Sequence, residues 1–282
     1  MYSFGGVRRV ASLLVVALAA VASASASAPL SLAFDRPVAT PHTLVVAHTS
    51  GKRVPPRVRR RTLRVYLQAD PLVPLGRLSV SRKGKGTLRF NVPNVPPGDY
   101  RALLRGMPGR PALRPVGSLR VLDGPALRTC EQSVYGRISD DQIARSPRLG
   151  PVHLIGYDPT EASDPSWSSL RPDRTTGQYA IKVLLVVDRG PAVTISIAPE
   201  DRKLIALTYI PLRFNLHRVT DQDAAVTFQP CSGSESIRWA SESRTQFNGG
   251  LVFVRPLCAH FELRIEGRPE SMTFALPFGK PC

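Results

Sequence analysis

A dense run of basic side chains has the clearest chemical consequence in this sequence. Ten residues belong to it, at 52–64 and 82–85: Lys52, Arg53, Arg57, Arg59, Arg60, Arg61, Arg64, Arg82, Lys83 and Lys85. Cationic side chains at this density attract polyanions, and such binding weakens as salt rises. We therefore predict an electropositive face that binds an anionic envelope polymer or an acidic glycan. The alternative is a solvated loop without a binding role. Arg outnumbers Lys 32 to six in the whole chain, which is typical of a GC-rich coding bias, so many arginines need not indicate recognition of an anion.

Four cysteines predict two disulfide bonds in an oxidising compartment; they are Cys130, Cys231, Cys258 and Cys282. Segments 261–266 and 272–276 are joined by a short connection, so we expect them to be antiparallel neighbours that bring Cys258 close to the C-terminus. This favours the pairs Cys258–Cys282 and Cys130–Cys231. The alternative, Cys231–Cys258 with Cys130–Cys282, stays open, because four cysteines allow three pairings.

Acidic side chains gather in one Pro/Ser-rich stretch of the C-terminal half. The stretch contains Asp158, Glu161, Asp164 and Asp173. These carboxylates could hold Ca²⁺, or two of them could act as the acids of a glycosidase. Their spacing fits no EF-hand, and Arg171 and Arg174 can neutralise them, so we favour a solvated turn.

The other motifs in the sequence lack residues that a catalytic or cofactor-binding site requires. Segment 84–87 (GKGT) lacks the Gly-Lys-Ser/Thr step into a helix that a phosphate loop needs, and segment 231–234 (CSGS) is not a nucleophile elbow. The five histidines stand apart, whereas zinc needs three or four convergent donors. No helix-turn-helix, zinc finger or RNP aromatic pair accompanies the basic run. We predict no catalytic residue, no metal, no cofactor and no specific nucleic-acid partner.

The N-terminus has the pattern of a secretory signal. Arg8 and Arg9 precede a short apolar run at 10–22, and alternating Ala and Ser follow up to residue 28. Small residues of this kind suit a signal peptidase, and the apolar run is shorter than the ~20 residues that span a bilayer. We expect residues 1–28 to be a signal peptide, with a retained membrane anchor as the alternative. The mature chain would then be secreted, extracellular or cell-wall associated, with no transmembrane span.

The charge divides the remaining chain near residue 125. Residues 29–127 contain 18 Lys and Arg against four acids, whereas residues 128–282 contain 18 against 17. Segment 122–125 (LDGP) also has the composition of a turn. We therefore predict a basic domain at 29–124 and a second, disulfide-stapled domain at 125–282.

The first domain has the pattern of an antiparallel β-sandwich. Strands are expected at 30–34, 43–48, 61–67, 75–81, 87–92, 100–104 and 116–122. Between 61 and 67 the apolar residues Leu63, Val65 and Leu67 alternate with polar ones, which places them on one face. The stretch 86–106 (GTLRFNVPNVPPGDYRALLRG) resembles the late strands of bacterial immunoglobulin-like domains. That resemblance implies a fold and no activity.

The second domain is also β-rich, so the fold class we expect is all-β, with two Ig-like or jelly-roll-like sandwiches. Its strands are expected at 152–157, 179–187, 192–198, 203–209, 224–229, 250–255, 261–266 and 272–276, with Asn248-Gly249 as a turn before the sixth. The pieces KVLLVVDRGPAVTISIAPEDRKLIALTY, AAVTFQPC, TQFNGGLVFVRPLC and LPFGKPC resemble a group of secreted proteins of unknown function from GC-rich bacteria. No reaction, ligand or catalytic residue follows from that resemblance.

Together these features predict a secreted, non-catalytic protein that binds or decorates the cell envelope. Charge attraction through the first domain would supply the binding, and the second domain would be a structural or recognition module. The alternative is an exported hydrolase or carbohydrate-processing protein that uses acids of the second domain. A concave pocket with converging acids and histidine would favour that alternative.

Overall fold

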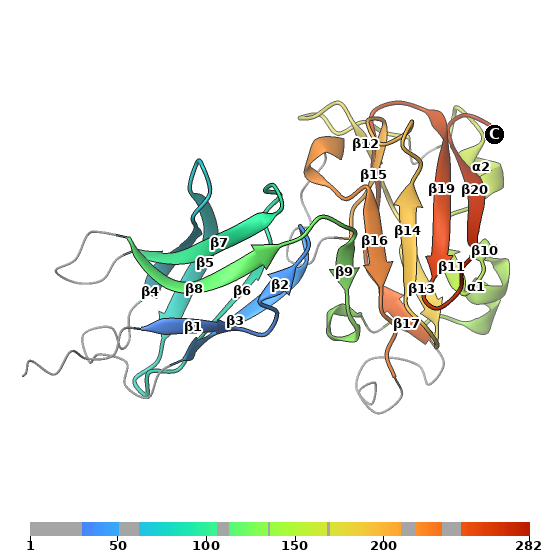
Figure 1. The fold of residues 1–282 in the computed structure, drawn as a ribbon. Coiled ribbons are helices and arrows are strands. Elements are labelled where there is room, and N and C mark those ends of the chain that lie inside the picture. Colours follow the sequence, from blue (N-terminus) through green and yellow to red (C-terminus); the bar gives the residue numbers. More distant parts are fainter. Residues whose placement is uncertain are drawn as a thin grey trace, which may run out of the picture.

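The chain forms two β-sheet bodies that lie side by side, joined between β8 (Arg114–Val121) and β9 (Ala126–Arg128) (Figure 1). This computed structural model describes residues 30–50, 62–105, 113–134, 136–167, 170–209, 218–232 and 244–282. The expected signal peptide lies outside these ranges. The buried apolar side chains form two clusters, which run from Leu30 to Val121 and from Ala126 to Phe278. The boundary predicted at 124/125 lies between the two clusters.

The first body is a single sheet that folds over itself as a sandwich. Its strands pair in antiparallel fashion, except for one short strand that pairs in parallel. Its strands follow the order β1-β3-β6-β5-β4-β7-β8-β2. They are β1 (Ser31–Phe34), β2 (Val38–Ala39), β3 (Leu44–Ser50), β4 (Thr62–Leu67), β5 (Val73–Val80), β6 (Gly86–Asn91), β7 (Gly98–Arg105) and β8 (Arg114–Val121). Gly117 of β8 lies against Phe34 of β1, so strands from the two ends of the strand order pack against each other.

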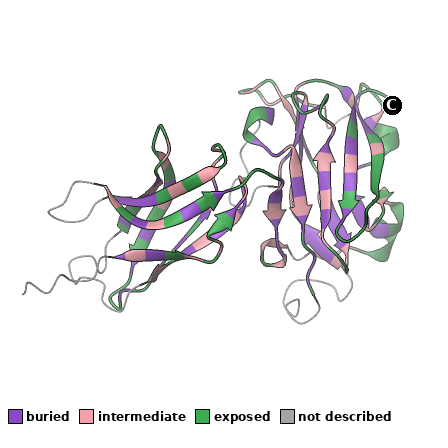
Figure 2. Ribbon diagram, in the orientation of Figure 1, coloured by how far each residue is buried: buried purple, intermediate pink, exposed green. Residues whose placement is uncertain are grey.

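Alternation of side chains builds the core of this sandwich. Leu63, Val65 and Leu67 of β4 are fully buried, while Thr62 and Arg64 face solvent, as the period-two pattern predicted. Figure 2 shows the same alternation along neighbouring strands. The Tyr100 hydroxyl donates a hydrogen bond to the Pro96 carbonyl at 2.7 Å. A tyrosine that reaches back over a strand corner in this way is a hallmark of immunoglobulin-like sandwiches.

The second body is a sandwich of two layers. One layer is a five-stranded sheet in the order β20-β19-β14-β16-β9, and the other contains the sheets β10-β11-β13-β17 and β12-β18-β15. The strands are β9 (Ala126–Arg128), β10 (Arg148–Leu149), β11 (Val152–Ile155), β12 (Tyr179–Lys182), β13 (Leu184–Asp188), β14 (Val193–Ile197), β15 (Ile205–Leu207), β16 (Ala225–Phe228), β17 (Arg244–Phe247), β18 (Gly250–Phe253), β19 (Leu257–Ile265) and β20 (Ser271–Phe278). Phe228 contacts Phe247, and Phe253 contacts Phe278, across the two layers.

Two features of the layer that contains β17 and β18 differ from the prediction. Asn248-Gly249 is not a hairpin turn, because β17 continues through it into β18 with only a local break. There the Val183 amide donates to the Gly249 carbonyl at 3.1 Å, and Gly250 lies against the Ile181 backbone. The strand β17 itself was not predicted, although it pairs with β13 over four residues.

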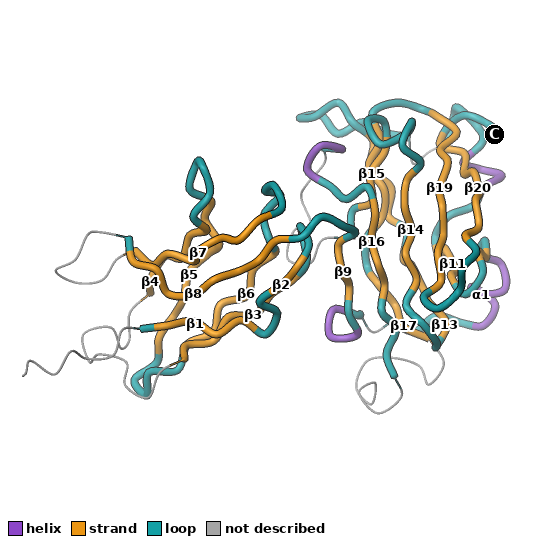
Figure 3. Tube along the Cα trace, in the orientation of Figure 1, coloured by secondary structure: helices purple, strands orange, loops and turns teal. Residues whose placement is uncertain are grey.

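Helices are few and short (Figure 3). The described ones are α1 (Asp140–Arg145), α2 (Pro159–Ala162), and the 3₁₀ turns Cys130–Gln132 and Val219–Asp221. Ser139 and Asp158 cap the two α-helices by accepting backbone N–H groups. None of the described helices is long and apolar enough to cross a membrane.

Buried polar contacts join the two bodies. Thr40 of the first body donates to the Pro125 carbonyl at 2.7 Å, and the Leu127 amide donates to the Thr43 hydroxyl at 3.1 Å. Arg128 of β9 lies beneath them with 1% of its side chain exposed. It donates to the carbonyls of His42 and Tyr209, which belong to different bodies. The two cores are therefore separate, but their junction is hydrogen-bonded.

Candidate functional site

The structure places four of the ten predicted basic residues and brings them to one end of the first body. Arg64 lies on the outer face of β4, and Arg82, Lys83 and Lys85 lie on the exposed hairpin between β5 and β6. This hairpin lies at the end of the sheet where β4 and β8 begin, away from the second body. The other six, Lys52, Arg53, Arg57, Arg59, Arg60 and Arg61, lie outside the described residues.

Arg64 is the centre of a cross-strand set of three arginines, here called the arginine row. Arg77 of β5 lies directly opposite Arg64 on one side, and Arg105 of β7 lies opposite it on the other. All three side chains are exposed. Cα atoms of directly opposite residues are only about 5 Å apart, and like charges placed there destabilise a sheet. An anion bound over the row would relieve this repulsion.

The surroundings of the arginine row are cationic. Among the described residues, no Asp or Glu forms a salt bridge with it, and the one described pair in this body, Arg120 with Asp99, is exposed and 3.9 Å long. The neighbouring side chain is Tyr66. The guanidinium of Arg64 lowers the pKa of Tyr66, desolvation opposes this shift, and Arg105 adds a smaller lowering effect. The row therefore offers guanidinium groups next to an aromatic ring.

The prediction from the sequence missed Arg77 and Arg105. Both lie outside the dense basic run, so charge counting alone does not single them out. A signal was present in the alternation, because Arg77 lies in a predicted strand and has to face outward when Leu78 and Val80 are buried. Their alignment with Arg64 depends on strand register, and the register of β4 with β5 shifts after Val65.

The acidic stretch of the second domain forms turns. Asp158 accepts the amides of Thr160 and Glu161 at the start of α2. Asp164 accepts the Ser166 amide at 2.7 Å, and this hydrogen bond lowers the pKa of Asp164. Asp173 accepts two further amides. Among the described residues, no group of three or more His, Cys, Asp or Glu side chains is placed to hold a metal ion.

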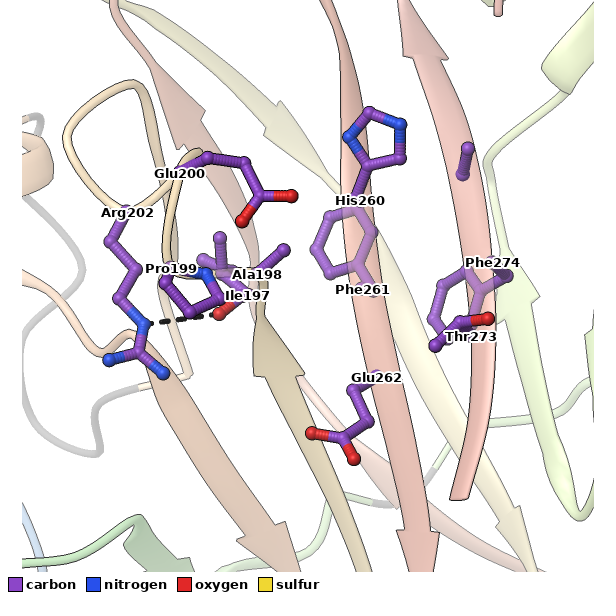
Figure 4. Close-up of a pocket in the computed structure, with 11 residues that line it drawn as sticks. Ile197, Ala198, Pro199, Glu200, Arg202, His260, Phe261, Glu262, Thr273 and Phe274 are labelled. Carbon is purple, nitrogen blue, oxygen red and sulfur yellow. Dashed lines mark hydrogen bonds between the residues drawn. The ribbon is translucent and has the colours of Figure 1, made fainter.

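A different set of acids and a histidine lines a hollow on the outer face of the five-stranded sheet. The hollow has a volume of about 560 Å³ and lies over β14, β19 and β20 (Figure 4). Its polar side chains are those of Glu200, Arg202, His260, Glu262 and Thr273. Hydrogen bonds from Ser271 and Arg264 lower the pKa of Glu262. Sequence analysis does not single out this set of residues, because Glu200 and His260 are 60 residues apart.

Both disulfides lie in the second body. Cys130 is bonded to Cys231 with the Cα atoms 4.8 Å apart, and Cys258 is bonded to Cys282 with the Cα atoms 5.1 Å apart. This is the favoured one of the two pairings weighed above. The register of β19 and β20 places Cys258 opposite Pro277, next to the terminal tail, as the predicted hairpin required.

Comparison with protein-family models and with curated proteins finds no match. Two solved structures that are similar to the chain are the BSP domain of a biofilm associated protein and the D0-D1 domain of intimin. The first is 10% identical with a TM-score of 0.24, and the alignment covers 88% of this chain and 29% of that chain. The second is 11% identical with a TM-score of 0.24, and the alignment covers 89% and 97% of the two chains. At these values neither similarity supports a conclusion about function.

Proposed function

We propose that this chain is a secreted, non-catalytic protein that attaches to anionic polymers of the cell envelope through its first domain. The observation that carries the proposal is the arginine row, in which Arg64, Arg77 and Arg105 stand opposite one another without a described acidic partner. The hairpin cations Arg82, Lys83 and Lys85 would extend the surface, and so would the predicted cations at 52–61. The first domain would span residues 29–124 and the second residues 125–282.

The compartment proposed for the chain agrees with its cysteine chemistry. Both pairs of cysteines are disulfide-bonded, and no described cysteine is free. Disulfides of this kind persist outside the cytoplasm. The pattern of residues 1–28 supports export through a signal peptide. Anionic wall polymers and acidic glycans are abundant polyanions in that environment, and we propose them as the partner.

The hydrolase alternative has one observation in its favour and one against it. The hollow of the second domain does bring together Glu200, Glu262 and His260. A glycosidase, however, needs one carboxylic acid whose pKa is raised, so that it can protonate the leaving group. The contacts of Glu262 with Ser271 and Arg264 lower its pKa instead. We therefore retain the proposal that the protein binds a polymer and is not an enzyme.

The proposal is tested by binding of the mature chain to two linear polyanions, long-chain polyphosphate and polygalacturonate. We expect binding to both at low salt and a steep loss of affinity as salt rises. The triple variant Arg64→Ala/Arg77→Ala/Arg105→Ala should lower the slope of log K against log salt by up to about 3 if each guanidinium contacts one anion. Preference for one polymer would identify the anion as phosphate or carboxylate.

The matched control removes the same charge from the second domain. Arg171, Arg174 and Arg268 are exposed, and the triple change of these residues to Ala should leave binding and its salt slope unchanged. Equal losses in both triple variants would mean that only net charge matters, and would contradict a defined face. The variant Arg59→Ala/Arg60→Ala/Arg61→Ala tests the adjacent predicted cations, and unchanged binding there would exclude them from the face.

A further inference from the structure

His260 is an exposed side chain that is held in one orientation by a buried carboxylate. Asp201 Oδ2 accepts hydrogen bonds from the His260 backbone amide at 2.8 Å and from its Nδ1 at 2.9 Å. The Asp201 side chain is 11% exposed, whereas that of His260 is 55% exposed. In the neutral imidazole that donates from Nδ1 to Asp201, Nε2 is an acceptor. Exposed side chains are usually free to change rotamer, so a fixed imidazole is suited to recognition.

Two carboxylates line the same hollow as this imidazole. Glu262 is on the same face of β19 two residues along, and Arg264 fixes it by contacts of 2.8 and 2.9 Å to Oε1. Glu200 follows β14 in an exposed turn, and Figure 4 shows its carboxylate directed toward the side of the hollow where His260 stands. The three groups therefore present hydrogen-bond acceptors from two different segments of the chain.

Apolar atoms complete the lining of the hollow. Ala198 and Pro199 border it next to Glu200, and Thr273 and Ala275, which lie opposite Glu262 and His260, border it from β20. A surface that combines acceptors with apolar patches is complementary to a sugar, whose hydroxyls donate hydrogen bonds and whose ring presents C–H groups. The volume of about 560 Å³ is in the range of small-molecule sites. Two carboxylates and the guanidinium of Arg202 border the hollow, and Arg264 pairs with Glu262, so the lining offers an acidic sugar no net positive charge.

We propose that this hollow is a binding site for an uncharged, hydroxyl-rich glycan. Glu200 and Glu262 would accept hydroxyl protons, and His260 Nε2 would accept a further one. Asp201 would be a positioning residue, because it touches His260 and not the ligand. This site is independent of the arginine row, so the chain would hold a charged polymer with one domain and a neutral glycan with the other.

The test is calorimetric titration of the full mature chain with tetra-N-acetylchitotetraose and maltotetraose, and with tetragalacturonate as the acidic comparison. We use about 0.5 M salt, at which binding of anions to the first domain is screened. At least one neutral tetrasaccharide should bind with an affinity that salt does not change, and tetragalacturonate should bind more weakly. Failure of both neutral tetrasaccharides to bind, or stronger binding of the acidic one, would overturn the proposal.

Single-residue variants test whether the tetrasaccharide binds in the hollow. Glu200→Ala and His260→Ala should each weaken binding of the neutral tetrasaccharide about tenfold or more, because each removes an acceptor. Glu270→Ala removes an exposed carboxylate of the same domain outside the hollow and should have no effect. Since Glu200 is exposed, its variant should fold normally. Unchanged affinity in Glu200→Ala and His260→Ala would show that the glycan binds elsewhere. The triple variant of the arginine row should bind this tetrasaccharide normally, which separates the two proposals.

Discussion

His42 of the first body donates a hydrogen bond from Nδ1 to Asp223 Oδ1 of the second body, and these atoms are 2.6 Å apart. The other carboxylate oxygen of Asp223 accepts from Arg128 at 2.8 Å. All three side chains are at least 90% buried. Burial lowers the pKa of Arg128 to about 10, and the charge of Asp223 opposes this shift. His42 also has a positive φ of 59°, an unfavourable backbone conformation that its surroundings must hold in place.

The change Asp223→Asn tests this junction. It leaves the buried Arg128 without its counter-charge, and breaking a buried ion pair in this way costs about 3–5 kcal/mol. We therefore expect the free energy of unfolding in urea to fall by that amount, and proteolysis near residues 122–125 to become faster. Asp221→Asn, the same change at an exposed position two residues away, should stay within about 0.5 kcal/mol of the parent. Equal stability of the two variants would rule out a stabilising role for the contact.

The two disulfides should contribute unequally to stability. Their sequence separations are 101 residues for Cys130–Cys231 and 24 for Cys258–Cys282. Chain entropy in the unfolded state predicts stabilisations of about 4.7 and about 3.5 kcal/mol. Double Cys→Ala variants of each pair should lower the free energy of unfolding in this order. Non-reducing peptide mapping checks the pairing itself, and a peptide that joins Cys231 to Cys258 would contradict it.

His153 should make stability depend on pH. Its side chain is 6% exposed, and burial lowers its pKa, with Asp188 opposing and Arg148 and Arg244 adding to the effect. A histidine whose folded-state pKa lies below the unfolded value of about 6.5 binds fewer protons when folded. The free energy of unfolding should therefore fall as pH drops below about 6.5, until the pH reaches the folded-state pKa.

Denaturation curves between pH 7.5 and pH 5 measure this dependence. His153→Phe should flatten the curve, because the buried group then no longer titrates. His48→Gln, at an exposed position in the first domain, should keep the slope of the parent. A slope that is the same in His153→Phe and in the parent would show that another group is responsible.

Gly250 should not tolerate a side chain. A Cβ atom at this position would overlap the Ile181 carbonyl of the neighbouring strand β12. Overpacking a rigid backbone contact costs about 1–3 kcal/mol, so Gly250→Ala should lower the midpoint of thermal unfolding. Gly98→Ala is the control, because its Cβ would meet the Tyr100 ring at an ordinary 3.6 Å. A stable Gly250→Ala protein would mean that β12 and β18 are packed less closely.

Local patterns in the sequence determined the elements of this fold. Period-two alternation places Leu63, Val65 and Leu67 inside because successive strand residues face opposite sides. The Pro-Gly corner before Tyr100, the cysteines and the excess of basic residues before 125 could also be read directly. Each of these features depends only on residues that are close together in the sequence, so it can be predicted without knowledge of the tertiary structure.

Only the tertiary structure decided which of these elements meet. The arginine row depends on the register of β4 with β5 and β7, and a slip of one residue would turn Arg64 inward. The contacts of His42 with Asp223 and of His260 with Asp201 join residues 181 and 59 positions apart. Such pairs follow from sheet order and from the packing of two separate cores. A hydrophobic pattern specifies a buried face but not the strand that lies beside it, and so the two proposed binding sites emerge from the fold.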